Sequence, residues 1–173
     1  MRRAGVVVAL GALLGILGGA VTASPALAGG RGDGWQFVPL EQQFTVDAQF
    51  CGFEIHGTHD VDKLFYKELK TADGSLAFLS TGAVKGSLTA NGKTITENVS
   101  GPAKVIFFPD GSVTVLEKGL QPTALAPDDA KRSNLPGFFI SAGALTEQFA
   151  PDGTITSLSL NGDILVDVCA ALS

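Results

Sequence analysis

Both histidines of the chain lie in one short segment that also carries carboxylates. His56 and His59 follow Glu54 closely, and imidazole and carboxylate groups can bind metals or transfer protons. The spacing does not favour a site, because residues three apart on a strand point to opposite faces. Gly57 and Thr58 disfavour the helix that would bring the two rings together. We expect no metal and no cofactor here, and His56 and His59 are the only candidate ligands.

Other signatures of catalysis are absent from the sequence. There is no G-x-S-x-G nucleophile motif, no S-x-x-K motif and no glycine-rich phosphate loop. A serine, histidine and aspartate set assembled through space stays open, since such sets are spread along a chain. The enzyme alternative is a hydrolase or isomerase that acts in a barrel cavity with His56 or His59 beside a carboxylate. We expect a protein without catalytic residues.

The two cysteines, Cys51 and Cys169, predict one disulfide. An even pair in an exported chain is typical of a bridge, whereas two free thiols or a metal pair are the alternatives. The bridge would close a loop of 118 residues, which the chain-entropy model values at about 5 kcal/mol. We expect the bridge to place the first and last strands side by side.

The first 28 residues have the layout of a secretory signal peptide. Arg2 and Arg3 precede an uncharged apolar stretch at 4–20, and Ala28 ends an A-x-A cleavage site. A transmembrane anchor is the alternative, but the apolar stretch is short and glycine-rich. We expect cleavage after Ala28, by the general or the twin-arginine route, and release of the protein without a membrane anchor.

Length and charge limit the remaining possibilities. The chain has 173 residues, which suits a single domain. It carries 17 acidic against 12 basic side chains, so we expect no nucleic-acid partner. The expected organisation is a signal peptide at 1–28, a flexible glycine-rich leader at 29–34 and a folded domain at 35–173.

Glycine-containing dipeptides divide the domain into short segments. Such pairs accept the positive φ values of hairpin turns, and they recur at Asp73-Gly74, Asn91-Gly92, Asp110-Gly111, Asp152-Gly153 and Asn161-Gly162. The segments between them are rich in Val, Ile, Thr and Phe, which favours strands. The predicted strands are 44–47, 53–56, 76–80, 84–89, 93–99, 104–108, 113–118, 138–141, 145–149, 154–160 and 163–168.

Three segments are less regular. Residues 62–70 contain good helix formers, and strand is only slightly favoured over helix. Residues 119–137 form a proline-containing break, within which 127–132 suits one helical turn because acidic residues come first and basic residues last. Phe138, Phe139 and Ile140 follow this break and could form the mouth of a pocket, with the break as its lid.

Sequential hairpins predict an all-β fold. A single antiparallel meander of this length must curl to protect its edges, so we expect a barrel or a barrel-like sheet. A two-layer β-sandwich is the alternative. The function that fits best is binding, either of a small apolar ligand inside a barrel or of an extracellular or cell-wall partner on its surface.

Several short motifs resemble a group of small secreted actinobacterial proteins of unknown function. The motifs are Cys-Gly-Phe at 51–53, Asn-Val-Ser-Gly-Pro at 98–102, Phe-Pro-Asp-Gly at 108–111, Pro-Gly-Phe at 136–138 and Asp-Val-Cys-Ala-Ala-Leu at 167–172. The resemblance implies a bacterial, exported, disulfide-containing β protein. It assigns no role to any residue and names no ligand.

Overall fold

The computed structural model describes residues 33–173, which form one antiparallel sheet and two short helices. The predicted signal peptide and residues 29–32 of the predicted leader lie outside the described residues. The elements are β1 (Gln36–Val38), β2 (Gln43–Val46), β3 (Ile55–Lys70), β4 (Leu76–Ala90), β5 (Lys93–Phe107), β6 (Val113–Ala124), α2 (Pro127–Ser133), β7 (Phe138–Phe149), β8 (Ile155–Asp167) and α3 (Val168–Leu172). Neither described helix is long and apolar enough to cross a membrane.

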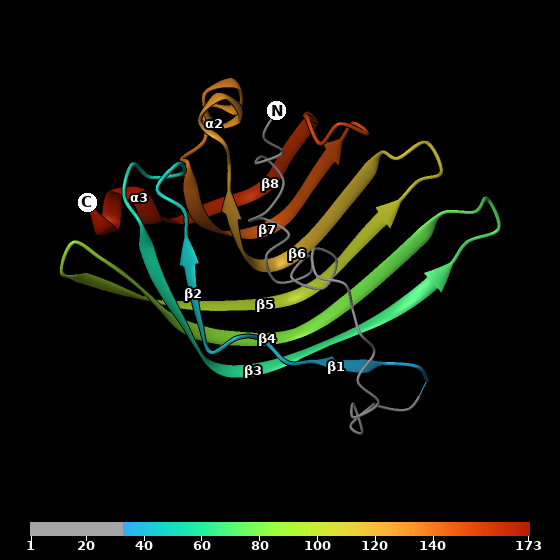
Figure 1. Cartoon of the computed structure of the whole chain (residues 1–173), viewed down its shortest axis with the longest axis horizontal. Helices are drawn as coiled ribbons and strands as arrows, with labels where there is room; N and C mark the ends of the chain where they lie inside the picture. Colours follow the sequence, from blue (N-terminus) through green and yellow to red (C-terminus); the bar gives the residue numbers. More distant parts are fainter. Residues whose placement is uncertain (1–32) are drawn as a thin grey trace.

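The prediction of an all-β fold is confirmed. Strands β3 to β8 form a meander in which each strand pairs with the next, and β1 and β2 pair with different parts of β3. Figure 1 shows the sheet as a strongly curved surface, with β3 and β8 on opposite sides of the curve. The sheet is not closed, so it is a barrel-like open sheet rather than a complete barrel.

A row of glycines crosses the sheet through the middle of the long strands. Gly82 lies opposite Gly101, and Gly143 lies opposite both Gly119 and Gly162. A Cβ atom at any of these positions would collide with a backbone carbonyl oxygen of the neighbouring strand. Glycine therefore permits the close approach of strands where they bend (Figure 1).

This row explains why the predicted strands were too short. Residues 76–80 and 84–89 belong to one strand, β4, and the same merging produces β5, β7 and β8. The turn predicted at Asn161-Gly162 is wrong, because these residues lie within β8. The predicted break at 119–137 is also too long, since β6 continues to Ala124. Glycine in these strands marks a bend, not a chain reversal.

The aspartate-containing turns, in contrast, are confirmed as hairpin ends. In each of three turns an aspartate Oδ1 accepts the backbone N–H two residues later, as Asp110 does from Ser112 at 2.9 Å. The hydroxyl of Thr71 on Asp73 and that of Ser112 on Asp110, together with these backbone N–H groups, hold the pKa of both aspartates below its usual value, and at Asp152 the backbone N–H of Thr154 has the largest effect. Strand β8 also contains an irregularity near its start, where the register with β7 shifts between Gln148 and Phe149.

The segments whose structure the sequence left open both have regular secondary structure. Residues 62–70 are strand, as part of β3, and residues 127–132 are helical, as part of α2. Helix α3 was not predicted. Asp167 caps it by accepting the backbone N–H of Ala170 at 3.0 Å.

The disulfide Cys51–Cys169 is confirmed, but its expected consequence for the strands is not. Cys51 lies in the loop between β2 and β3, and Cys169 lies in α3. The bridge therefore fastens a loop to a helix and does not place the first and last strands side by side. It lies beside the largest core cluster, where α3 contributes Val168 and Leu172. The covalent link thus holds α3 over the strand ends that it packs against.

Candidate functional site

The two histidines occupy opposite faces of β3. His56 pairs with Thr89 and His59 pairs with Gly86 on β4, and positions three apart on β4 alternate in face. The His56 side chain is 67% exposed, and its Nε2 lies 3.4 Å from an Oε1 of Glu54. Among residues 33–173 no group of three or more His, Cys, Asp or Glu side chains could hold a metal ion.

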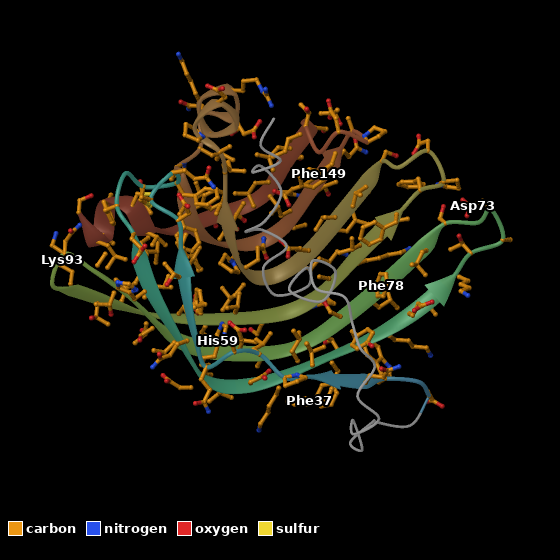
Figure 2. The ribbon with its side chains drawn as sticks, in the orientation of Figure 1. Phe37, His59, Asp73, Phe78, Lys93 and Phe149 are labelled. Atoms are coloured by element: carbon orange, nitrogen blue, oxygen red, sulfur yellow. A yellow bond between two sulfur atoms is a disulfide. The ribbon has the colours of Figure 1, made fainter. Side chains whose placement is uncertain are left out.

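His59 has a different environment (Figure 2). Its Nδ1 lies 2.6 Å from the carbonyl oxygen of Glu41, and its ring stacks on Phe44 with centroids 4.6 Å apart. The Phe44 ring in turn lies where a side chain on residue 57 would be, which explains the glycine there. These contacts hold β2 against β3 and give the His59 ring a structural role.

The predicted pocket mouth lies in the protein interior. Phe138, Phe139 and Ile140 are all buried. Phe138 and Ile140 pack in the core cluster with Val46 and Leu88. The shorter connection that precedes them, 125–137, contains α2, and its Leu125 is buried as well. The apolar residues after the proline segment therefore fill this end of the sheet.

A row of polar side chains, four of them buried and one (Glu117) half-buried, lies on β6 and β7. We call it the polar row; it consists of Glu117, Gln121 and Thr123 on β6 and Ser141 and Glu147 on β7. Gln121 lies directly opposite Ser141 in the ladder. Residues opposite each other, and every second residue along a strand, share a face. The uninterrupted β6–β7 register therefore places all five side chains on one face of the sheet.

The polar atoms of this row lack partners. Gln121, Thr123, Ser141 and Glu147 are at most 3% exposed in the 173-residue chain. Among residues 33–173, no hydrogen-bond partner is present for Glu117 Oε2, both amide atoms of Gln121, the Thr123 and Ser141 hydroxyls, or either carboxyl oxygen of Glu147. Buried polar groups are nearly always hydrogen-bonded. A concentration of unpartnered atoms in one row is therefore unusual for a purely structural sheet.

Burial also changes the acidity of the carboxyl groups. Removal from water raises the pKa of Glu117 to about 8, with a further contribution from the charge of Glu147. It raises the pKa of Glu147 to about 7, with a contribution from Asp129 of α2. Glu97 on β5 is buried too, and desolvation raises its pKa to about 7. These three carboxyl groups therefore titrate near neutral pH.

Apolar residues flank the row on the same face. Val115 lies opposite Glu147, and Leu145 lies opposite Glu117. Val115 also packs with Val105 and Phe149 in a second core cluster, and Phe149 is labelled in Figure 2. The face thus combines a large apolar area with hydrogen-bonding groups, which is the usual composition of a small-molecule site.

A separate hollow lies at the strand ends near the β5–β6 turn. Its volume is about 530 Å³, and Phe108, Asp110, Thr114, Gln148 and Thr156 are among its lining residues. The Thr156 hydroxyl already donates to the Gln148 carbonyl at 3.1 Å. None of the unpartnered buried atoms described above lies in its lining. The polar row therefore provides the stronger candidate.

The sequence contained a signal for part of this row. Val113, Val115 and Glu117 alternate, as do Leu145, Glu147 and Phe149, so each glutamate shares a face with apolar residues. Gln121 and Thr123 were missed because they were assigned to a break. Comparison of the chain with protein-family models, curated proteins and solved structures gives no match.

Proposed function

We propose that the protein is a non-catalytic binding protein whose ligand is a small, largely apolar molecule that carries hydrogen-bonding groups. The observation that carries the proposal is the polar row with its unpartnered buried atoms. Each such atom costs about 1–3 kcal/mol when it is left unsatisfied. A ligand that hydrogen-bonds to Gln121, Thr123 and Ser141 would remove that cost, while Val115 and Leu145 would contact its apolar part.

We further propose that the protein works outside the cell. The signal-peptide layout of residues 1–28 supports export, and a disulfide is typical of oxidising compartments. The resemblance to small secreted actinobacterial proteins is consistent with this location and remains a prediction. A ligand bound outside the cell could be captured from the medium or carried by the protein.

The hydrolase or isomerase alternative has less support. His59 Nδ1 is hydrogen-bonded to the Glu41 carbonyl oxygen, and Nε2 of the exposed His56 lies 3.4 Å from Oε1 of Glu54. Neither histidine lies on β6 or β7, which carry the polar row.

Binding of an extracellular or cell-wall partner is the second candidate. The feature that favours it is β8, whose described ladder partner is β7 alone. Ile164 and Leu165 on this strand are 38% and 55% exposed. An exposed strand edge with apolar side chains is a common place for another chain to pair.

Native mass spectrometry of the protein from its source organism tests the first proposal. We expect extra mass that leaves on denaturation. The variant Thr123→Val removes one hydroxyl of the row at constant shape, and Thr146→Val does the same on the opposite face of β7. Loss of the bound mass in Thr123→Val, with retention in Thr146→Val, supports the site. A bare monomer, or bound mass that survives equally in both variants, refutes it; the former would favour a surface partner.

A further inference from the structure

We infer that the ligand of this site is an organic cation, an amine or ammonium group on an apolar body, and that its charge lies between Glu117 and Glu147. The inference rests on the proposed function and names the ligand class for the same site. Its basis is the arrangement of the two carboxyl groups and the absence of a basic partner for them among the described residues.

The two glutamates are diagonal neighbours across the β6–β7 ladder. Glu117 pairs with Leu145, and Glu147 pairs with Val115, so their side chains extend from the same face one step apart. Diagonal neighbours lie about 7–8 Å apart at Cα, within reach of long side chains. The charge of Glu147 acts on Glu117. One small cation between them can therefore contact both carboxylates.

Three of their four carboxyl oxygens, Glu117 Oε2 and both oxygens of Glu147, are buried and have no hydrogen-bond partner in the described part of the chain. An ammonium group has three N–H donors and no acceptor, so its requirements match what these oxygens offer. Hydrogen bonds between a cation and a carboxylate are about twice as strong as neutral ones. An anionic ligand, in contrast, would be repelled by each carboxyl group that is ionised.

No basic side chain of the chain fills this role in the described residues. On other elements, the charge of Asp129 on α2 acts on Glu147, and Arg132 lies on the same helix. Arg132 forms an ion pair with Asp129 and also donates to the carbonyl of Ile155 at 3.1 Å, so its charge is used there. Lys118 on β6 is exposed and lies one position from Glu117, on the other face.

A metal ion fits less well than an organic cation. Hard cations such as calcium require six to eight oxygen ligands, and no metal-holding group of three acidic, His or Cys side chains is present among residues 33–173. The apolar surroundings, with Val115, Leu145 and Phe149 buried nearby, favour a cation that brings a hydrocarbon body with it.

Binding of such a cation should displace protons. In the free protein the raised pKa values of Glu117 and Glu147 leave these carboxyl groups partly protonated near neutral pH. A bound ammonium group favours the charged form of each carboxyl. The proton leaves as the carboxylate forms, so the complex contains the cation, the carboxylate and one released proton for each group that ionises.

Three probes with one hydrocarbon chain separate charge from apolar contact: octylammonium, octanol and octanoate. Titration calorimetry at neutral pH should show octylammonium binding at least about tenfold more tightly than octanol, and octanoate most weakly. Repeating the octylammonium titration in two buffers of different ionisation enthalpy should reveal proton release. The charge of any co-purified molecule from native mass spectrometry provides an independent reading.

The double variant Glu117→Gln, Glu147→Gln keeps the side-chain shape and removes the charge. We expect it to lose the preference for octylammonium while it still binds octanol, and the exposed Glu54→Gln control to behave as the unmodified protein. Three results would overturn the inference without contradicting the proposed site. They are equal binding of octanol and octylammonium, a neutral or acidic co-purified molecule, and an unchanged preference for octylammonium in the double variant. No binding of any probe and no co-purified molecule overturns both.

Discussion

Glu117 should make the stability of the protein fall as the pH rises, and Glu117→Gln should remove that dependence. The carboxyl group has a pKa of about 8 in the folded chain and an ordinary value of 4.5, which we take for the unfolded chain. The folded state therefore binds the proton more tightly than the unfolded state does. The stabilising contribution is fully present below pH 4.5 and is lost progressively as the pH rises to about 8.

The size of the effect follows from these two values. Each pKa unit corresponds to about 1.4 kcal/mol, and between about pH 5 and about pH 7 the free energy of unfolding should fall by about 2.5 kcal/mol from Glu117 alone. Glutamine has the shape of the protonated acid but does not titrate. The Glu117→Gln variant should be about 0.8 kcal/mol more stable than the unmodified protein near pH 5 and about 3.4 kcal/mol more stable near pH 7, so that the difference grows by about 2.5 kcal/mol.

Urea unfolding with the disulfide intact measures this difference over a series of pH values. Glu54→Gln is the matched control, because it makes the same substitution at a side chain that is 58% exposed. Parallel stability curves for Glu117→Gln and the unmodified protein would refute the reasoning. They would mean that Glu117 is hydrated or compensated in the folded state.

Two further substitutions test the fold. Gly143→Ala should lower the free energy of unfolding by about 3 kcal/mol, because residue 143 has φ of +128° and a Cβ there meets the Asn161 carbonyl. The control Gly92→Ala, with φ of +74° and no neighbour within 4 Å, should lower it by only about 1 kcal/mol. Equal losses in urea unfolding would contradict a close-approach role for Gly143. Replacing both cysteines by serine should lower the free energy of unfolding by up to about 5 kcal/mol and should increase amide hydrogen exchange in α3 before the sheet. A uniform increase of exchange throughout the sheet would contradict the idea that the disulfide anchors α3 locally.

The fold class, the disulfide and most hairpin turns could be predicted from the sequence because their signals are local. Proline or a polar residue before glycine, at Asp110-Gly111 for example, specifies a reversal through its own φ preference and side-chain hydrogen bonds. Strand length could not be predicted in this way. Asn161-Gly162 gives the same local signal as a turn, but the role of Gly162 depends on the Ala142 carbonyl of the neighbouring strand.

The polar row could not be predicted for a related reason. The alternation at 145–149 places Glu147 on a face with apolar residues, but only the register shows that it lies opposite Val115 and in one row with Gln121 and Ser141, and register is a property of pairs of strands. Its lack of a hydrogen-bond partner depends on everything that packs nearby. The chemistry of a histidine is visible in the residue type alone, whereas the chemistry of Glu147 arises from burial.

The glycine row and the polar row are connected through the same two strands. Gly119 and Gly143 lie opposite each other in the ladder, between the Glu117–Leu145 pair and the Gln121–Ser141 pair. The bend that these glycines permit therefore divides the polar row into a carboxyl part and a part with amide and hydroxyl groups. A ligand that spans both parts would lie across the bend, with its cationic end at Glu117 and Glu147 and its neutral polar groups at Gln121 and Ser141. The curvature of the sheet and the composition of the proposed site thus have one origin in the sequence, since a side chain at residue 119 or residue 143 would both oppose the bend and occupy the middle of the row.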